Sequence, residues 1–247
     1  MLSLMFDGFI RDIKESFKKL HWYDWIMIIL MIGIASQQVV QAFINPIASK
    51  NPLWLTIVNF ISAICGVVCV FFCAQASISN FSFGIINTFV YAVYLLYWKI
   101  YGTFALEVLF YLPIDVAMWI AWCKNRDYID KEKCLTRKLT FIQSVIVYTL
   151  VVISGITYHS VLIRLGGTVP WLDAFTVAIG IIAVLLQLFR FKEQYVLWII
   201  VDIVSVGMYI VHFDPVYLTK RVIYTIVAVI GLYNWHMLNK NRNLMNK

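Results

Sequence analysis

Residues 52–74 read PLWLTIVNFISAICGVVCVFFCA, a run of 23 residues without a charged side chain. A helix needs roughly 20 predominantly apolar residues to cross a bilayer, so this stretch predicts a transmembrane helix. The whole chain of 247 residues has the same character, with 62% apolar residues, 13% charged residues and a mean hydropathy of +0.82. Soluble domains are about 45–50% apolar and about 25% charged. The composition therefore predicts a polytopic membrane protein and excludes a soluble enzyme or nucleic-acid binder.

Eight apolar stretches of this kind are separated by short connections and one longer loop. They cover residues 23–44, 52–74, 81–98, 104–122, 140–161, 170–189, 195–213 and 217–238. We expect Pro52 and Pro170 to begin helices and Pro113 to kink the fourth span. The stretches use most of the chain, so no separate soluble domain is expected.

Lysine and arginine are distributed unequally between the two sets of alternating connections. The set that includes both chain ends holds 15 of them, and the other set holds five: Lys50, Lys99, Arg164, Lys220 and Arg221. Basic residues favour the cytoplasmic side, so this asymmetry predicts that both termini are cytoplasmic. The net charge of +7 is thus explained by orientation in the bilayer and indicates no nucleic-acid partner.

Residues 1–22 precede the additional span at 23–44 and form a different kind of segment. Their apolar and basic side chains repeat at helical spacing on opposite faces, which predicts an amphipathic helix on the cytoplasmic membrane surface. The apolar face holds Phe6, Phe9, Ile10, Ile13, Phe17 and Leu20, and the basic face holds Arg11, Lys14, Lys18 and Lys19. At the other end, residues 239–247 are predicted to be a cytoplasmic tail.

A weak internal similarity predicts two repeats of three helices, residues 52–122 and 170–238. The basic loop and linker helix at 123–163 would join them in the same orientation, a plan known from transporters. Matching positions lie 115 residues apart, or 116 for the last pair: Phe83 and Trp198, Asn87 and Asp202, Tyr94 and Tyr209, Trp119 and Trp235.

The seventh span carries aromatic and polar side chains on one helical face. A carboxylate deep within a span, such as that of Asp202, is costly in a membrane, usually faces the bundle interior and marks a site. Two such stripes facing each other would form a slot for a flat polar ring, although aromatic stripes also serve as packing. The seventh span contributes Tyr195, Trp198, Asp202, Ser205 and Tyr209, and the third span contributes Phe83, Asn87, Tyr91, Tyr94 and Trp98.

Other polar side chains within the spans are candidates either for the pathway or for hydrogen bonds between helices. Asp115 is the deeper of two acidic residues in the fourth span, and Glu107 lies near its end. The main amide candidates are Asn59, Gln187 and Asn234. The sequence contains no catalytic or nucleotide-binding motif and no cysteine or histidine pair at metal-ligand spacing. We therefore expect neither an enzyme nor a cofactor or metal site.

Residues 80–122 and 192–235 are similar to the PnuC family of bacterial vitamin transporters. The family carries a Trp-x-x-Trp-x-x-x-Asn motif in the span corresponding to the seventh. This chain has Tyr195, Trp198 and Asp202 at those positions, so the second Trp is kept while the first Trp and the Asn are replaced. The resemblance covers about residues 52–238 and implies a three-plus-one-plus-three arrangement like that of SWEET-type sugar transporters.

The resemblance also implies facilitated diffusion of nicotinamide riboside across the bacterial inner membrane. A cytoplasmic kinase would trap the product by phosphorylation, and a homo-oligomer such as a trimer is implied as well. Similar relatives carry thiamine or riboflavin. A pyridinium or thiazolium cation would gain from Asp202 and from an indole face, so nicotinamide riboside and thiamine both remain open. A sugar facilitator and a membrane scaffold without transport are weaker alternatives, because neither requires a carboxylate beside Trp198.

Overall fold

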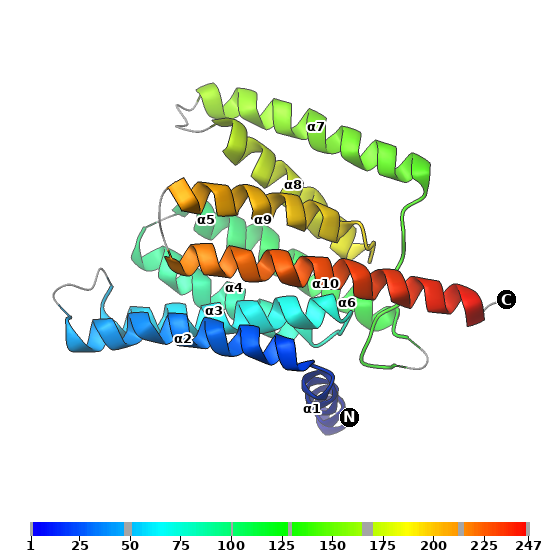
Figure 1. Ribbon diagram of the computed structural model, residues 1–247, viewed down its shortest axis with the longest axis horizontal. Helices are drawn as coiled ribbons and strands as arrows, with labels where there is room; N and C mark the ends of the chain where they lie inside the picture. Colours follow the sequence, from blue (N-terminus) through cyan, green and yellow to red (C-terminus); the bar gives the residue numbers. More distant parts are fainter. Residues whose placement is uncertain are drawn as a thin grey trace. The chain divides into compact units, whose positions relative to one another are not determined.

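The computed structural model describes residues 2–46, 51–99, 101–127, 130–164, 170–211 and 215–245, and this part of the chain is helical apart from turns and three isolated bridges (Figure 1). The all-α class predicted from the sequence is confirmed. The helices are α1 (Leu2–Lys18), α2 (Trp22–Ile44), α3 (Leu53–Ala74), α4 (Asn80–Tyr97), α5 (Tyr101–Leu106), η1 (Glu107–Tyr111), α6 (Leu112–Lys124), α7 (Phe141–Arg164), α8 (Pro170–Leu188), α9 (Gln194–Val211) and α10 (Pro215–Met245).

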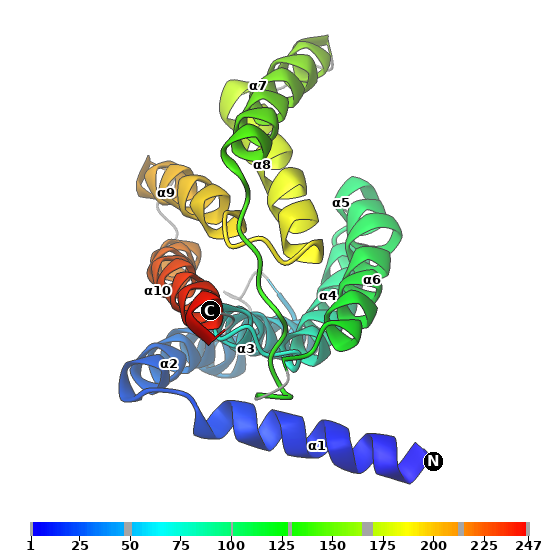
Figure 2. The same ribbon diagram turned by 90° about the vertical axis from the view of Figure 1, so that its right-hand side faces the viewer.

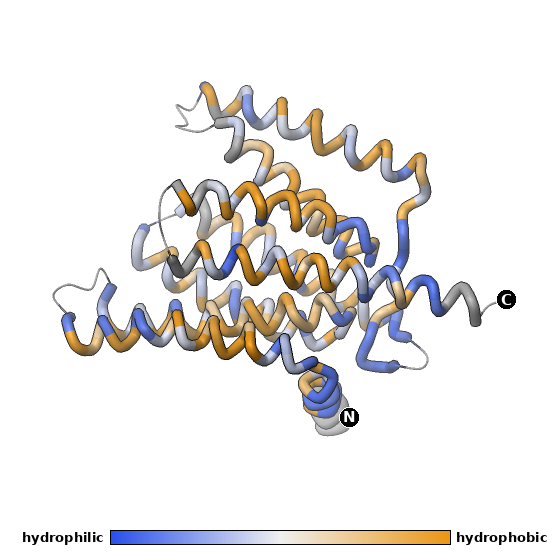
Figure 3. Tube along the Cα trace, in the orientation of Figure 1, coloured by the Kyte–Doolittle hydropathy of each residue, from blue (hydrophilic) through white to orange (hydrophobic). Residues whose placement is uncertain are grey.

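Six of these helical stretches are long and apolar enough to cross a membrane. They are Trp22–Ile44, Leu53–Ala74, Asn80–Tyr97, Phe104–Lys124, Phe141–Val161 and Leu218–Asn241, and two shorter apolar helices cover Ala174–Leu188 and Gln194–Gly207. Large apolar side chains are widely exposed on them, including Phe141 and Ile142 at 84% and 71%. Figure 3 shows these apolar helices and the hydrophilic segment between α6 and α7. Water-soluble proteins rarely expose apolar surface so extensively, so the chain is a multi-pass membrane protein.

The chain forms two compact units, Met1–Cys134 and Leu135–Lys247, which divide within the long basic loop. In the first unit α3 packs against α2 and α4, and α4 packs against α6. Its core includes Phe72, Phe81 and Trp122, which are almost completely buried.

The second unit begins with the loop segment that leads into α7. In this unit α8 packs against both α7 and α9, and α9 packs against α10 (Figure 1). A cluster of buried residues on α7, α8, α9 and the connecting loops forms its core: Leu139, Val151, Ile179, Ala183, Leu186, Phe191, Leu197 and Val201.

The same tight turn follows α3 and α8. Ala76 and Arg190 have φ values of 59° and 64°, a conformation uncommon for residues with a side chain. In both turns the next amide donates to the carbonyl five residues earlier at 2.9 Å. The following helices begin with the buried amides Asn80 and Gln194. Corresponding residues of the two turns lie 114 positions apart, one fewer than the offset expected from the sequence.

A similar aromatic pair occurs in each of the two units. The ring of Phe81 on α4 meets that of Trp122 edge-on at 4.9 Å, and Tyr195 on α9 meets Trp235 on α10 edge-on at 5.4 Å. Phe81 and Tyr195 lie 114 positions apart, whereas Trp122 and Trp235 lie 113 apart. The ring contact of Trp235 thus resembles that of Trp122, while the predicted match of Trp235 with Trp119 stays a prediction.

The fourth span is irregular where Pro113 was expected to disturb it. Residues Glu107–Tyr111 form a π-helical turn between α5 and α6, and the amide of Leu112 donates to the carbonyl of Glu107, five residues back. Proline has no amide hydrogen to donate within a helix, and single π-turns are a common accommodation of such breaks. The π-helical turn ends at Tyr111, two residues before Pro113 and four residues before Asp115.

Helix α1 lies crosswise to α2, α3 and α4 within the first unit (Figures 1 and 2). Residues Leu2–Lys18 are helical, as the spacing of their side chains predicted, while the position of α1 at the membrane surface stays a prediction. Phe17 packs edge-on against Phe72 of α3 at 4.9 Å and Phe83 of α4 at 6.0 Å. The apolar face of α1 therefore covers ends of membrane-spanning helices in its own unit.

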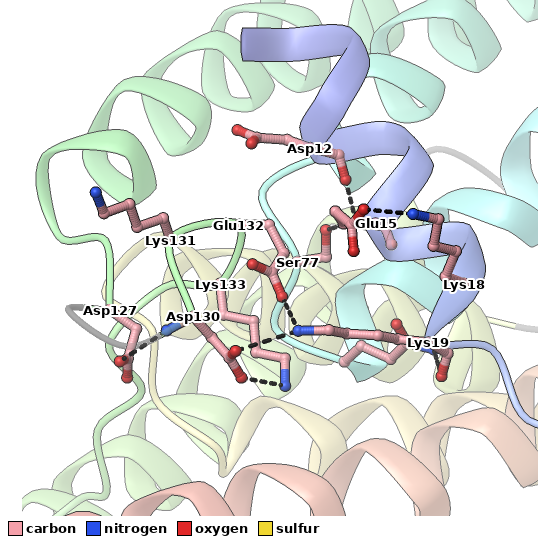
Figure 4. Close-up of polar contacts among 12 residues, drawn as sticks. Asp12, Glu15, Lys18, Lys19, Ser77, Asp127, Asp130, Lys131, Glu132 and Lys133 are labelled. Atoms are coloured by element: carbon pink, nitrogen blue, oxygen red, sulfur yellow. Dashed lines mark hydrogen bonds and ion pairs between the residues drawn. The ribbon is translucent and has the colours of Figure 1, made fainter.

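Polar side chains of α1 also bind the loops that follow α3 and α6 (Figure 4). The Ser16 hydroxyl is 2.7 Å from that of Ser77, and Asp12 accepts a hydrogen bond from Arg126 at 2.8 Å. Lys19 forms ion pairs with Asp130, at 3.2 Å, and with Glu132. Lys19, which the sequence pattern placed on the solvated basic face, thus has a specific role in attaching α1 to this unit.

Candidate functional site

The predicted stripe on α9 divides between two packing interfaces of the second unit. Tyr195 is 3% exposed and packs against α10, where its ring also lies over Gly231. Trp198, one turn later, is half-buried and packs against the core cluster formed with α7 and α8. Tyr195 is therefore positioned as a helix–helix contact, whereas Trp198 keeps part of its indole exposed.

Asp202 is the acidic residue of the stripe and is deeply buried, with 2% of its surface exposed. Arg221 of α10 donates from Nη1 to the carboxylate oxygen Oδ1 of Asp202 at 2.9 Å. The neighbouring Ser205 hydroxyl donates to the carbonyl of Val201 on its own helix at 2.7 Å. Asp202 therefore belongs to an ion pair between α9 and α10.

Sequence reasoning missed Arg221 as a candidate site residue. Its charge was assigned to the connection before the last span, but the structure places it within α10 and in contact with Asp202. The signal was present in the sequence: an arginine within an apolar stretch needs a partner, because an unpaired charge is costly in a membrane. Identifying that partner required knowledge of how α9 and α10 pack.

The remaining candidates of the second unit lie on α8, α9 and α10. Gln187 is half-buried near the end of α8, where its carbonyl accepts a hydrogen bond from the amide of Arg190. Asn234 is half-buried on α10 beside Trp235. Tyr209 belongs to α9, but its side chain lies outside the described part of the structure. Roles for these residues in ligand binding stay predictions.

In the first unit, polar candidates on neighbouring helices pair with each other. Ser62 of α3 donates to the side-chain oxygen of Asn87 on α4 at 2.7 Å. The next residue of α4, Thr88, donates to a carboxylate oxygen of Asp115 on α6 at 3.5 Å. These contacts place Asn87 and Asp115 in the polar interior of the first unit, where each also serves as a hydrogen-bonding link between helices.

Two tyrosines continue the stripe of α4. The rings of Tyr91 and Tyr94 are stacked, with centroids 6.0 Å apart and planes 11° from parallel. Both residues are half-buried, as is Asn59 on α3. A stacked pair of this kind can offer an aromatic surface to a flat ring, and Asn59 can offer an amide, but their contact with a ligand stays a prediction.

Among the described residues, no group of three histidine, cysteine or acidic residues could hold a metal ion. The five cysteines are not joined by disulfide bonds. In the second unit the candidate residues thus include one carboxylate paired with Arg221, and in the first unit a carboxylate near Thr88, and each unit also contributes amides and aromatic rings. Such groups can bind a small polar aromatic molecule through stacking, hydrogen bonds and charge.

Comparison with known proteins gives a consistent result. The profile of the family described as Nicotinamide mononucleotide transporter matches residues 56–237. A nicotinamide riboside transporter PnuC of Neisseria mucosa is 30% identical over 93% of this chain and 87% of its own length. The protein of the same name in Haemophilus influenzae is 28% identical over 77% and 82%, respectively.

A solved structure agrees with these relatives. The crystal structure of the vitamin B3 transporter PnuC has a TM-score of 0.69 and 28% sequence identity to this chain, and the match covers 90% of this chain and 94% of that one. The resemblance identified from the α4–α6 and α9–α10 sequences is therefore confirmed over most of the chain. The match over residues 56–237, together with the Neisseria relative, shows that the chain belongs to the nicotinamide mononucleotide transporter family.

Proposed function

We propose that this protein carries nicotinamide riboside across the cytoplasmic membrane of a bacterium by facilitated diffusion. The observation that carries the proposal is the half-buried Trp198 one helical turn before Asp202, in a chain 30% identical to a nicotinamide riboside transporter over nearly its whole length. The indole can stack on the pyridinium ring, and the polar groups nearby can bind its carboxamide and ribose. A cytoplasmic kinase that phosphorylates the riboside would maintain inward flux.

The proposed architecture is eight spans with both termini in the cytoplasm, built as two three-helix bundles joined by α7. The recurrence of the turn at Ala76 and Arg190, and of the edge-on aromatic pairs, supports two repeats of common origin. We also propose that α1 lies at the cytoplasmic membrane surface, which its crosswise orientation to α2–α4 supports. Assembly as a homotrimer is part of the same proposal.

Candidate substrate residues are proposed within each unit. In the second unit Trp198 and Asp202 are the main residues, with Tyr195, Gln187, Tyr209 and Asn234 as further candidates. In the first unit the candidates are Asn59, Asn87, Tyr91, Tyr94 and Asp115.

The experiment is counterflow in proteoliposomes that contain the purified protein and no ion gradient. Labelled nicotinamide riboside, nicotinamide mononucleotide, thiamine and glucose are compared at equal concentration. We expect exchange of nicotinamide riboside above the protein-free control and little exchange of glucose.

Thiamine is the second candidate because its thiazolium is also a cation that an indole face would favour. The mononucleotide tests the substrate in the family's name directly, since its phosphate adds negative charge to the ribose of the same nucleoside. Exchange of thiamine or the mononucleotide alone, without the riboside, would show that the proposed substrate is wrong.

A further inference from the structure

The ion pair between Asp202 and Arg221 sets the net charge beside Trp198 in the proposed substrate site. Asp202 lies in the middle of α9 with only 2% of its surface exposed, so an unpaired carboxylate there would be strongly disfavoured. Arg221 compensates it through a direct contact of 2.9 Å. The chemically relevant group at this position is therefore the neutral pair and not a bare carboxylate.

The guanidinium reaches Asp202 from the seventh residue of α10 and makes an end-on contact through Nη1. Its side chain is 30% exposed, compared with 3% for the side chain of Asp202. The positive member of the pair is thus the one closer to accessible space. The planar guanidinium can therefore act on a bound ligand as well as on Asp202.

The neighbouring cation has a different environment. The ammonium group of Lys220 lies 5.5 Å from the centre of the Tyr224 ring, one turn along the same helix. Lys220 and Arg221 are consecutive in the sequence, but among the described residues it is Arg221 that forms the ion pair with Asp202. Lys220 also acts electrostatically on Asp202, so Lys220→Gln tests how much the direct contact of Arg221 adds.

The pair lies close to the proposed stacking surface. Trp198 and Asp202 are four residues apart on α9, which places their Cβ atoms about 5–6 Å apart on one face. A ring stacked on the exposed part of the indole would therefore experience the charge of Asp202 directly. With Arg221 present, the opposite charge largely cancels that field.

We propose that Arg221 sets the charge selectivity of the substrate site by neutralising Asp202, so that a cationic ring and an uncharged ring of the same shape bind with similar affinity. This inference rests on the proposed function, because it takes nicotinamide riboside as the ligand. It identifies the α10 arginine as a specificity-determining residue that acts through the carboxylate on α9.

The experiment compares the binding of two ligands of nearly the same shape to each purified protein. Nicotinamide riboside carries a pyridinium cation, whereas its 1,4-dihydro form has an uncharged ring with the same ribose and carboxamide. The ratio of their Kd values is measured by calorimetry, and this ratio is insensitive to the fraction of protein that is active. For the unchanged protein we expect Kd values within about tenfold of each other, since a neutral pair exerts little net field at the ring and the remaining preference comes from the cation–π contact with Trp198.

Arg221→Gln leaves the carboxylate unpaired, so we expect the ratio to shift by about tenfold or more in favour of the cation. Asp202→Asn leaves the guanidinium unpaired, and the ratio should shift by a similar factor in favour of the uncharged form. The double variant Asp202→Asn/Arg221→Gln and the charge-conserving Arg221→Lys should both keep the original ratio. Lys220→Gln should change it by less than about threefold.

Each variant tests the inference independently, so failure of one to fold does not prevent the test. Ratios that stay constant in the single variants while both ligands still bind would overturn the inference and show that the pair only stabilises helix packing. A preference of the unchanged protein for the cation by more than tenfold would also overturn it. Absence of binding of either riboside to the unchanged, folded protein would instead contradict the proposed function itself.

Discussion

Ala76 and Arg190 adopt the same left-handed backbone conformation, with φ of 59° and 64°, at the same place in the two units of the chain. Each ends a tight turn after an apolar helix, and each precedes a helix that begins with a buried amide. The turn geometry reverses the chain within a few residues at the end of a span. The requirement for a positive φ at this point predicts how substitutions there change stability.

Ala76→Gly should raise the free energy of unfolding by roughly 0.5–1 kcal/mol. A left-handed conformation costs a residue with a side chain roughly 1–2 kcal/mol, and the greater unfolded-state freedom of glycine offsets part of that gain. Arg190→Gly should give no gain, because the guanidinium Nε of Arg190 donates to the carbonyl of Leu135 at 3.1 Å. Thermal unfolding in detergent measures both. A larger stabilisation by Arg190→Gly than by Ala76→Gly would contradict the reasoning.

Gly231→Ala should destabilise the contact between α9 and α10. A Cβ at this position would lie 2.5 Å from the Tyr195 ring, which is held from another side by Trp235. Overpacking of a filled interface typically costs about 1–3 kcal/mol.

The matched control for this overpacking is Gly180→Ala on α8, where nothing lies within 4 Å of the added atom. Alanine is favoured over glycine in a helix by about 0.8–1 kcal/mol, so this variant should be at least as stable as the original. Thermal unfolding of the two variants in the same detergent compares them. Equal stability of both would show that Tyr195 can move aside.

The attachment of α1 should depend on pH through Lys19 and Asp130. Partial burial acts to lower the pKa of Lys19, but its hydrogen bonds to Glu132 and Asp130 outweigh this and raise the pKa. Partial burial acts to raise the pKa of Asp130, but hydrogen bonds from Lys133 and Lys19 outweigh it and lower the pKa. A raised lysine pKa stabilises the fold below about pH 10, and a lowered aspartate pKa stabilises it above about pH 4.

Lys19→Met should therefore lower the melting temperature at pH 7, and the difference should shrink as the pH falls below about 4. The side chains of Lys19 and Asp130 are 37% and 40% exposed, so the effect is small. Roughly 0.5–1 kcal/mol corresponds to about 1–4 °C for a chain of this size. Lys18→Met is the control, because Lys18 pairs only within α1 among the described contacts, with Glu15. An unchanged Lys19→Met difference from pH 7 to pH 3 would contradict this account.

Trp198→Ala should weaken the binding of nicotinamide riboside without unfolding the protein. Stacking of an aromatic ligand is worth about 1–3 kcal/mol, which corresponds to a roughly 5- to 150-fold increase in Kd. Trp54→Ala on α3 is the control, because that indole is 50% exposed on an apolar helix outside the proposed site. Calorimetric titration of both purified variants gives the comparison. Unchanged affinity in Trp198→Ala would place the aromatic platform elsewhere.

Transport should require neither an ion gradient nor a nucleotide. Asp115 is the main candidate for a proton carrier, but its carboxylate already accepts a hydrogen bond from Thr88 at 3.5 Å, which suits a structural link between α4 and α6. In proteoliposomes, an imposed pH or sodium gradient should not concentrate the substrate. In Asp115→Asn these gradients should likewise cause no accumulation, whatever the rate of counterflow, since an amide can accept the hydrogen bond from Thr88 but carries no proton. Accumulation driven by protons and lost in Asp115→Asn would overturn the passive mechanism.

The two predicted three-helix repeats show which part of the architecture the sequence alone could indicate. The match between the third and seventh spans indicated two related halves, because their aromatic and polar residues recur at helical spacing. The turns at Ala76 and Arg190 lie 114 positions apart, one fewer than the offset of 115 between the two spans, because the similarity of single residues does not fix an alignment. The ring contacts likewise associate Trp122, and not Trp119, with Phe81.

The sequence by itself determined the class of protein, the apolar spans, the amphipathic α1 and the family resemblance, because hydropathy and helical periodicity are properties of residues near each other in the chain. Only the tertiary structure decided which side chains meet. Lys19 and Asp130 are 111 positions apart in the sequence, and Asp202 and Arg221 lie on different helices. Their charges pair because helix packing brings them within hydrogen-bonding distance, and an ion pair depends on that distance and not on sequence spacing.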